Sequence, residues 1–178
     1  MAGKGKYYES QFEEATIELL RESHWQYTFG DDIHRKYTDP LIEEDLRTFL
    51  AAQYKDKKLT ASEVDGIVAN LRNTGGQNDY YALQNTFLLY RDGYDFTYSD
   101  GRDNPFRLQY IDFEHPDHNI FRCVNQFVME QGRENRRPDI LLFVNGIPVC
   151  IVELKNPTKQ NATIRDAYTQ ICTRYMRD

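Results

Sequence analysis

The segment RRPDILLFVNGIPVCIVELKNP, residues 136–157, constrains the fold more than any other part of the chain. It holds two apolar runs, ILLFV and VCIV, on either side of the dipeptide Asn145-Gly146. Both residues of this pair tolerate a positive φ, which two-residue β-turns require. The segment therefore predicts a β-hairpin.

Three charged residues stand at the open end of this hairpin: Asp139, Glu153 and Lys155. Side chains alternate along a strand, so Glu153 and Lys155 share a face. A two-residue loop would pair Asp139 with Val152 and turn it to the other face, whereas one extra loop residue would bring it to the face of Glu153. We therefore predict a three-residue loop or an equivalent bulge.

Asp139 and Glu153 would then lie a few ångströms apart, which is unfavourable for two carboxylates without a cation. Oxygen ligands with no His or Cys nearby favour Mg²⁺ or Mn²⁺, and the backbone carbonyl of Leu154 could add a further ligand. Lys155 could hold or deprotonate an attacking water, or stabilise a phosphate as a point charge. The pattern favours phosphodiester hydrolysis, and the alternative is a surface ion pair at a strand end.

The 178 residues suit a single domain, with a mainly helical part at 1–92 and a strand-rich part with a C-terminal helix at 93–178. This predicts an α/β (α+β) fold with a mixed or antiparallel central sheet flanked by helices. We expect helices at about 11–22, 40–54, 61–74, 79–91 and 161–177, and strands near 25–29, in three antiparallel segments between 94 and 130, and in the hairpin.

Local signals set the expected helix starts. Capping boxes are predicted at Ser10 and Thr60, each with a Glu three residues later, and Asp39 before Pro40 is typical of a cap. Apolar spacing predicts the buried faces, which in the first helix include Leu19 and in the last helix consist of Ile164, Ala167, Tyr168, Ile171 and Tyr175.

The net charge of -6 is unusual for a protein that binds nucleic acid, but residues 131–178 carry eight basic and five acidic residues. The C-terminal third is therefore the part expected to meet an anion, although such a gradient is also ordinary surface variation. Cys123, Cys150 and Cys172 are expected to be small core residues. Without a long apolar run or a secretory signal, we expect a soluble, cytoplasmic protein.

The segment EHPDH holds His115 and His118 in an H-x-x-H spacing that can bind zinc. No cysteine or second ligand pair accompanies it in the sequence. A polar turn between strands is the interpretation that we favour.

The strings RPDILLFVNGIPVCIVELKNP and IDFEHPDHNIFRCVNQFVM resemble the N-terminal PD-(D/E)xK nuclease domain of the R (restriction and motor) subunit of type I restriction enzymes. The resemblance spans most of the chain and implies a restriction-endonuclease-like core. It makes Asp139 the motif aspartate, Glu153 the second acidic ligand and Lys155 the catalytic lysine of a Mg²⁺- or Mn²⁺-dependent DNA endonuclease.

Further roles follow from the same resemblance. The family carries a glutamine and, three intervening residues later, a tyrosine in the next helix. Gln170 corresponds to the glutamine, with a role in the site. Tyr175 corresponds to the tyrosine, with a role at the DNA, although four residues separate the two here. An acidic residue of the first helix completes many such sites, and Glu14 is preferred over Glu13.

Arg133, Arg136 and Arg137 precede the motif aspartate and are expected to contact DNA phosphates, unless they form a solvated basic loop. The chain contains no G-x-x-x-x-G-K-[ST] motif, so ATP is expected only for motor domains outside this chain. The chain is therefore expected to be a fragment of a larger subunit.

The resemblance implies that double-stranded DNA, methylation and specificity subunits and the subunit's own motor domains are partners, with no membrane. Two alternatives stay open. One is a stand-alone PD-(D/E)xK restriction or repair nuclease, and the other is a non-catalytic module of the same fold for DNA docking or assembly.

Overall fold

The computed structural model describes residues 9–74, 79–131, 134–155 and 164–174, which contain five α-helices and eight β-strands. They divide into two units. The sheet unit comprises residues up to Pro40, Phe121–Phe143 and Ile147 onward, and the helical unit comprises Leu41–Ile120 and Val144–Gly146. With helices and a four-stranded mixed sheet, the fold is α/β, as predicted.

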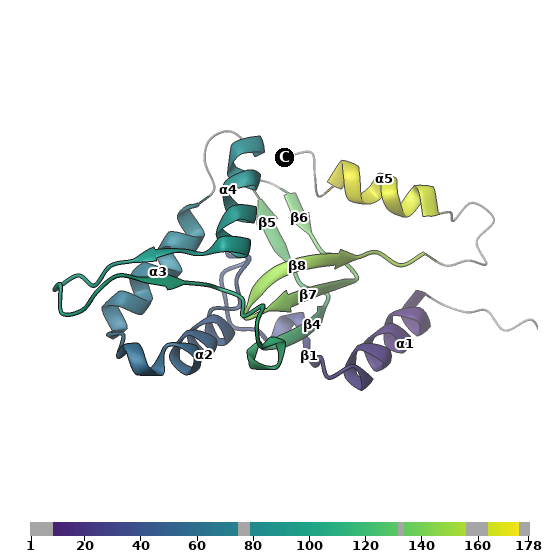
Figure 1. Cartoon of the computed structure of the whole chain (residues 1–178). Helices are drawn as coiled ribbons and strands as arrows, with labels where there is room; N and C mark the ends of the chain where they lie inside the picture. Colours follow the sequence, from purple (N-terminus) through teal and green to yellow (C-terminus); the bar gives the residue numbers. More distant parts are fainter. Residues whose placement is uncertain (1–8, 75–78, 132–133, 156–163, 175–178) are drawn as a thin grey trace, which may run out of the picture. The chain divides into compact units, whose positions relative to one another are not determined.

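The central sheet has the strand order β1-β4-β7-β8 (Figure 1). Its strands are β1 (Gln26–Phe29), β4 (Phe121–Asn125), β7 (Ile140–Val144) and β8 (Ile147–Val152). β4 and β7 are antiparallel, because Asn145 N–H bonds Ile120 O at one end and Gln126 N–H bonds Asp139 O at the other.

β1 and β4 pair in parallel, with Tyr27 opposite Cys123. The prediction that the segment containing β4 would be antiparallel is therefore only partly correct. The reason is the long connection between these strands: parallel neighbours require a crossover, and here residues 30–120 provide it.

Helix α1 (Glu9–Glu22) covers the core of the sheet unit. Ile17, Cys123 and Ile140 are buried there, and half-buried apolar residues pack against them: Leu20, Trp25, Tyr27, Leu142, Val152 and Leu154. α1 includes Ser10, so the predicted cap at Ser10 is wrong, and Leu19 is exposed rather than buried.

The hairpin β7–β8 differs from its predicted loop. Only Asn145 and Gly146 separate the strands, both with positive φ (51° and 75°), so the predicted three-residue loop is wrong. An uninterrupted hairpin with this loop would place Ile140 opposite Ile151. Instead, Val152 packs on the core beside Ile140, so the alternation of sides shifts by one residue along the second strand.

The sheet unit also contains the antiparallel ribbon β5 (Met129–Gln131) and β6 (Glu134–Arg136), and helix α5 (Ile164–Arg174). Ile164 and Tyr168 of α5 are exposed, so the predicted buried face is wrong for these two residues. Cys150 is exposed as well, whereas Cys123 is buried as predicted.

The helical unit contains α2 (Glu43–Gln53), α3 (Ala61–Asn73), α4 (Asp79–Asp92) and the hairpin of β2 (Tyr94–Phe96) and β3 (Phe106–Leu108). Three short 3₁₀ helices complete the described elements: η1 (Gly30–Asp32) in the sheet unit, and η2 (Lys55–Lys57) and η3 (Pro116–His118) in the helical unit. The largest buried side chains of this unit include Leu46, Leu50, Ile67, Leu108 and Tyr110. The capping box at Thr60 is confirmed, since its side chain accepts from Glu63 N–H and Glu63 accepts from Thr60 N–H.

Helix α2 begins at Glu43 instead of following Asp39 directly. Ile42 donates its N–H to Gly146 O (2.9 Å) and has φ −94°, ψ 86°, which is not helical. This contact with the hairpin turn delays the helix, so the predicted cap at Asp39 is wrong. Among the described helices, none has the length and apolarity that crossing a membrane requires.

Candidate active site

The charged residues of the hairpin lie just beyond its strands. β7 starts at Ile140, directly after Asp139, and β8 ends at Val152, directly before Glu153. Outside the strand ladder the backbone is no longer held to strict alternation, so these side chains can turn toward one another. The backbone N–H of Leu154 donates to Asp139 Oδ2 at 2.6 Å, which ties the two open ends together.

Glu153, Lys155 and Gln170 form a second, closed group. Lys155 Nζ donates to Gln170 Oε1 (2.6 Å), and Gln170 Nε2 donates to Glu153 Oε2 (2.8 Å). Lys155 Nζ also lies 3.9 Å from Glu153 Oε2. Gln170, from α5, therefore holds the ammonium and the carboxylate of the hairpin in one arrangement.

The side chain of Glu153 is buried, so its carboxylate needs polar partners. The side chain of Glu153 is only 2% exposed, and a carboxylate removed from water requires hydrogen bonds or an opposite charge. Gln170 and Lys155 supply one of each. A buried carboxylate held beside an ammonium is an arrangement that is frequent at functional sites.

Helix α1 also contributes an acidic residue. Glu13 Oε1 accepts hydrogen bonds from Asn125 Nδ2 (2.7 Å) and Gln126 Nε2 (3.4 Å). Gln126 in turn donates its backbone N–H to Asp139 O (3.4 Å). Glu13 is thus joined to the segment that carries Asp139, whereas Glu14 is exposed.

Two features hold Gln126 in place. Its φ is 55°, and a Cβ on Gly30 would lie 2.6 Å from its carbonyl oxygen, so only glycine allows this close approach. The sequence interpretation did not include Asn125 or Gln126. Their position at the end of a strand, Asn125 as its last residue and Gln126 directly after it, was the available signal.

The residues predicted to contact DNA are not part of the contacts described above. Arg136 lies in β6 and Arg137 is exposed, while Arg133 and Tyr175 lie outside the described residues. Contact of these residues with DNA stays a prediction, as does metal binding by Glu14.

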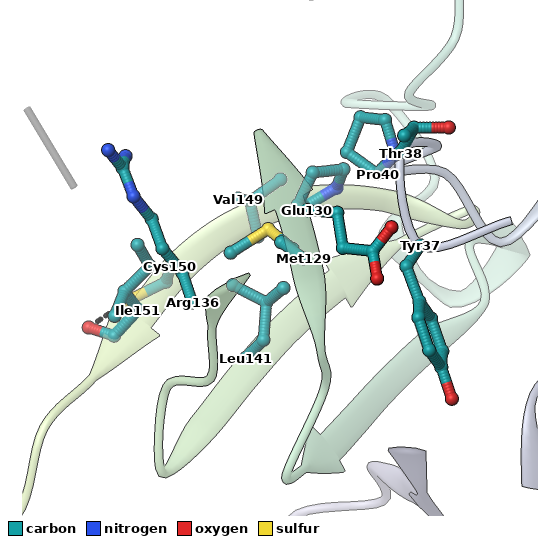
Figure 2. Close-up of a pocket in the computed structure, with 11 residues that line it drawn as sticks. Tyr37, Thr38, Pro40, Met129, Glu130, Arg136, Leu141, Val149, Cys150 and Ile151 are labelled. Carbon is teal, nitrogen blue, oxygen red and sulfur yellow. Dashed lines mark hydrogen bonds between the residues drawn. The ribbon is translucent and has the colours of Figure 1, made fainter. Parts of the chain in front are cut away.

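The sheet unit has a cavity of about 470 Å³ (Figure 2). It is lined by Tyr37, Thr38, Pro40, Met129, Glu130, Arg136, Leu141, Pro148, Val149, Cys150 and Ile151. Asp139, Glu153, Lys155 and Gln170 are not among these residues, so this mainly apolar hollow is distinct from the group of polar side chains.

The donor set at the hairpin end fits a hard divalent cation. Asp139 and Glu153 offer carboxylate oxygens, and no imidazole or thiolate takes part in the contacts described above. Such oxygen-only sets suit Mg²⁺ or Mn²⁺ better than zinc.

Comparison with known proteins places the chain in a family. The family model for the type I restriction enzyme R protein N terminus matches residues 6–178. The chain belongs to this family. The resemblance drawn from the two sequence strings is thereby confirmed.

Two relatives match most of the chain in sequence. The type I restriction enzyme HindI endonuclease subunit of Haemophilus influenzae is 29% identical over 93% of the chain. A Methanocaldococcus jannaschii protein with the assigned name type I restriction enzyme MjaIXP endonuclease subunit is 30% identical over 88% of the chain. The chain spans 16% of the length of each of these relatives.

Proposed function

We propose that this chain is the DNA-cleaving part of a type I restriction enzyme and hydrolyses phosphodiester bonds with Asp139, Glu153 and Lys155. The observation that carries the proposal is the group of Glu153, Lys155 and Gln170 beside Asp139 in a member of the R protein N-terminal family. The names of the relatives, endonuclease subunits of restriction enzymes, support the same role.

Asp139 and Glu153 would hold a Mg²⁺ or Mn²⁺ ion, with the Leu154 carbonyl as a further oxygen ligand. Neutralising the charge that builds on the phosphoryl oxygens is the chemistry that the ion would supply there. Asp139 Oδ2 already accepts the Leu154 N–H, which orients the carboxylate before any ligand binds.

Lys155 would act at the phosphate. In hydrolysis, a water molecule loses a proton to solvent as its oxygen bonds to phosphorus, the bond from phosphorus to the leaving sugar oxygen breaks, and that oxygen takes up a proton from solvent. The Lys155 ammonium can orient the water or stabilise the negative phosphate in the transition state. Gln170 would be a positioning residue, because its amide holds both Lys155 Nζ and Glu153 Oε2.

The decisive experiment replaces Lys155 with Ala or Glu153 with Gln in the assembled full-length enzyme. We expect DNA cleavage to fall by at least about a hundredfold, as for loss of a group that stabilises transition-state charge. ATP-driven translocation should continue, because the proposed site takes no part in it. Cleavage products on supercoiled DNA and translocation rates provide the two measurements.

Matched controls are available on the surface of the same unit. Lys36→Ala and Glu22→Gln change exposed residues of the same types and should leave cleavage unchanged. If either site variant cut DNA as fast as its control, the assignment of the site would be wrong.

Titration of the 178-residue chain with Mn²⁺ tests the ligands separately. Calorimetry should show heat of binding for the wild-type chain and none for Asp139→Asn. Absence of heat in both would favour the non-catalytic docking module. A type I enzyme also implies that methylation and specificity subunits and the subunit's own motor domains are partners of the full-length protein.

A further inference from the structure

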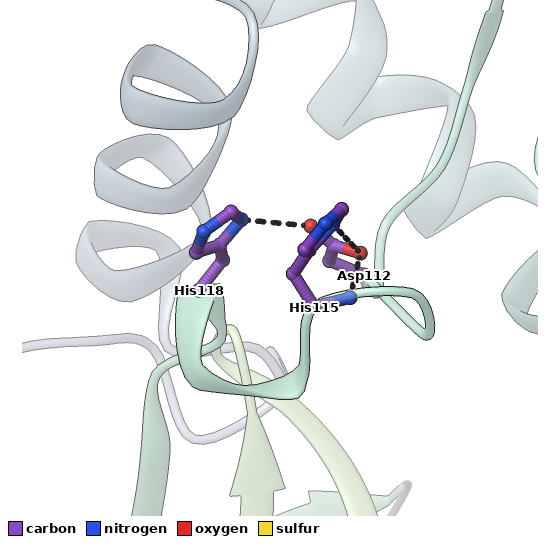
Figure 3. Close-up of side chains that lie close together, drawn as sticks. All are labelled: Asp112, His115 and His118. Atoms are coloured by element: carbon purple, nitrogen blue, oxygen red, sulfur yellow. Dashed lines mark hydrogen bonds and ion pairs between the residues drawn. The ribbon is translucent and has the colours of Figure 1, made fainter.

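The connection between β3 and β4 gathers three side chains that the proposed hydrolysis does not use (Figure 3). They are Asp112, His115 and His118, all in the helical unit. One ligand atom from each lies within 4.8 Å of the other two. From the sequence we favoured a polar turn here, because no cysteine or second ligand pair accompanies the two histidines; Asp112 lies outside the segment EHPDH.

Asp112 is the buried member of this trio, with a side chain 5% exposed. Its Oδ1 accepts the backbone N–H groups of Glu114 (3.0 Å) and His115 (2.8 Å). Its Oδ2 accepts Gln53 Nε2 (2.9 Å). These bonds hold the Asp112 carboxylate in a fixed orientation beside the two histidines.

The turn itself is fixed by Asn119. The Asn119 side chain accepts the Asp112 N–H (2.9 Å) and donates to Asp112 O (2.7 Å) and Pro116 O (2.9 Å). The turn is therefore closed by protein contacts, and little conformational entropy would be lost when a ligand binds. Such surrounding hydrogen bonds are the kind that orient metal ligands.

The distances suit a tetrahedral ion. His118 Nδ1 lies 3.0 Å from Asp112 Oδ2, and His115 Nδ1 lies 3.8 Å from Asp112 Oδ1. Ligand bonds of about 2.0–2.1 Å in a tetrahedral zinc site separate the ligand atoms by roughly 3.3 Å, so an ion would replace the contact between His118 and Asp112 Oδ2 and draw His115 inward.

Access is also suitable. The histidine side chains are 64% and 55% exposed, and their rings stack with centroids 5.0 Å apart. An ion can therefore reach the trio from solvent, and a water molecule can complete its coordination. Buried Asp112 supplies a negative charge at the base of the site.

We propose that Asp112, His115 and His118 bind a divalent transition-metal ion of the zinc class. Two imidazoles and one carboxylate are a ligand set that zinc accepts and that Mg²⁺ does not favour. The site is chemically different from the oxygen-only set at Asp139 and Glu153, so the two can be occupied independently. Bound zinc would clamp the β3–β4 connection.

The test uses the tag-free 178-residue chain carrying Asp139→Asn and Glu153→Gln, which removes the carboxylates of the hydrolytic site. Calorimetric titration with Zn²⁺ should show one equivalent bound. Titration with Co²⁺ should give the visible absorption of a four-coordinate ion with nitrogen and oxygen ligands.

In the same background, His115→Asn with His118→Asn should abolish both signals. The matched control is His24→Asn with His34→Asn, which removes the other two of the four histidines and should bind as before. Gln53→Ala keeps all three ligands but loses the bond that orients Asp112 Oδ2, and should weaken Zn²⁺ binding roughly tenfold.

Circular dichroism of each variant verifies that the fold is retained. Equal Zn²⁺ binding by His115→Asn/His118→Asn and by the control would overturn the proposal, as would absence of binding in the parent chain. Either result would leave Asp112 with the role of holding a turn.

Discussion

Asn145 has two structural roles, of which the sequence indicates only the turn. Its positive φ makes the hairpin turn, but its fully buried side chain also makes three hydrogen bonds in the helical unit. Oδ1 accepts the Ile120 N–H (2.7 Å), and Nδ2 donates to Tyr110 O (2.9 Å) and Asn119 Oδ1 (2.8 Å). The turn residue is thus also a buried polar junction.

Asn145→Gly should therefore lower the free energy of unfolding by about 3 kcal/mol, because buried partners lose their hydrogen bonds while the positive φ is still allowed. Asn145→Ala should cost about 1 kcal/mol more, since alanine is strained in this region. Denaturant unfolding measures both. The control Asn104→Gly, at an exposed loop position, should change little. A similar small change for Asn145→Gly would contradict the role of the side chain.

Sequence patterns predicted the position of the turn at Asn145, because that signal is local, although the loop has two residues rather than three. The bonds of Asn145 to Ile120 and Tyr110 could not be predicted in this way, because they join residues far apart in the chain. The trio with Asp112 was missed for a related reason: its burial, which the sequence does not display, distinguishes that carboxylate from other surface acids.

At the scale of elements, local sequence signals predicted helix starts correctly only where no tertiary contact competes with them. α3 begins as its capping box predicts, because Thr60 and Glu63 satisfy each other within one turn. α2 starts late because Ile42 bonds the hairpin turn. The hairpin keeps a two-residue turn at Asn145 and Gly146. The side-chain alternation shifts within β8 instead, because Val152 packs on the core.

Glu63 of α3 gives a pH-dependent prediction. Hydrogen bonds from Arg102 and then from Thr60 lower its pKa from 4.5 to about 2. Because the folded pKa is the lower one, these contacts stabilise the protein fully above pH 4.5, and their contribution declines as the pH falls and is lost near pH 2.

The prediction is checked with Glu63→Gln in thermal unfolding. The variant should melt below the wild type at pH 7, and the difference should shrink between pH 4.5 and 2. Glu44→Gln, an exposed change in α2, should show no such pH-dependent difference. A Glu63→Gln deficit that stayed constant down to pH 2.5 would argue against the ionic contacts as its cause.

Helix α1 provides a second element-scale prediction. Glu13→Ala should lower the free energy of unfolding by about 1 kcal/mol, because Asn125 and Gln126 lose a charged acceptor. The neighbouring change Glu14→Ala, at an exposed position, should stay within about 0.5 kcal/mol of the wild type. Urea unfolding distinguishes the two, and equal effects would mean that the Glu13 contacts contribute no stability.

At the scale of the whole molecule, the candidate site combines a local part with parts distant in sequence. Asp139, Glu153 and Lys155 lie at the open end of one hairpin, so the sequence predicted their nearness, although the loop length that was to align them is wrong. Gln170 comes from α5, and only the resemblance to known nucleases pointed to it. Glu13 and Gln126 come from segments over a hundred residues apart, and no local pattern relates them.

The two proposed metal sites lie in different units, which predicts separate responses to two ions. Mn²⁺ should slow hydrogen exchange at the Leu154 amide, whose N–H bonds Asp139, because binding disfavours the locally opened form. Zn²⁺, added to the Asp139→Asn/Glu153→Gln chain, should instead slow the amides of Glu114 and His115, which bond Asp112.

At free metal one hundred times the dissociation constant, each protected amide should exchange about a hundredfold more slowly. Exchange read by mass spectrometry of short peptides measures both segments in one experiment. Unchanged exchange at Leu154 with Mn²⁺ would count against the hydrolytic metal site, and unchanged exchange at His115 with Zn²⁺ would count against the zinc site. Because the ligand sets differ in softness, each ion should act on its own segment at concentrations that leave the other segment unaffected.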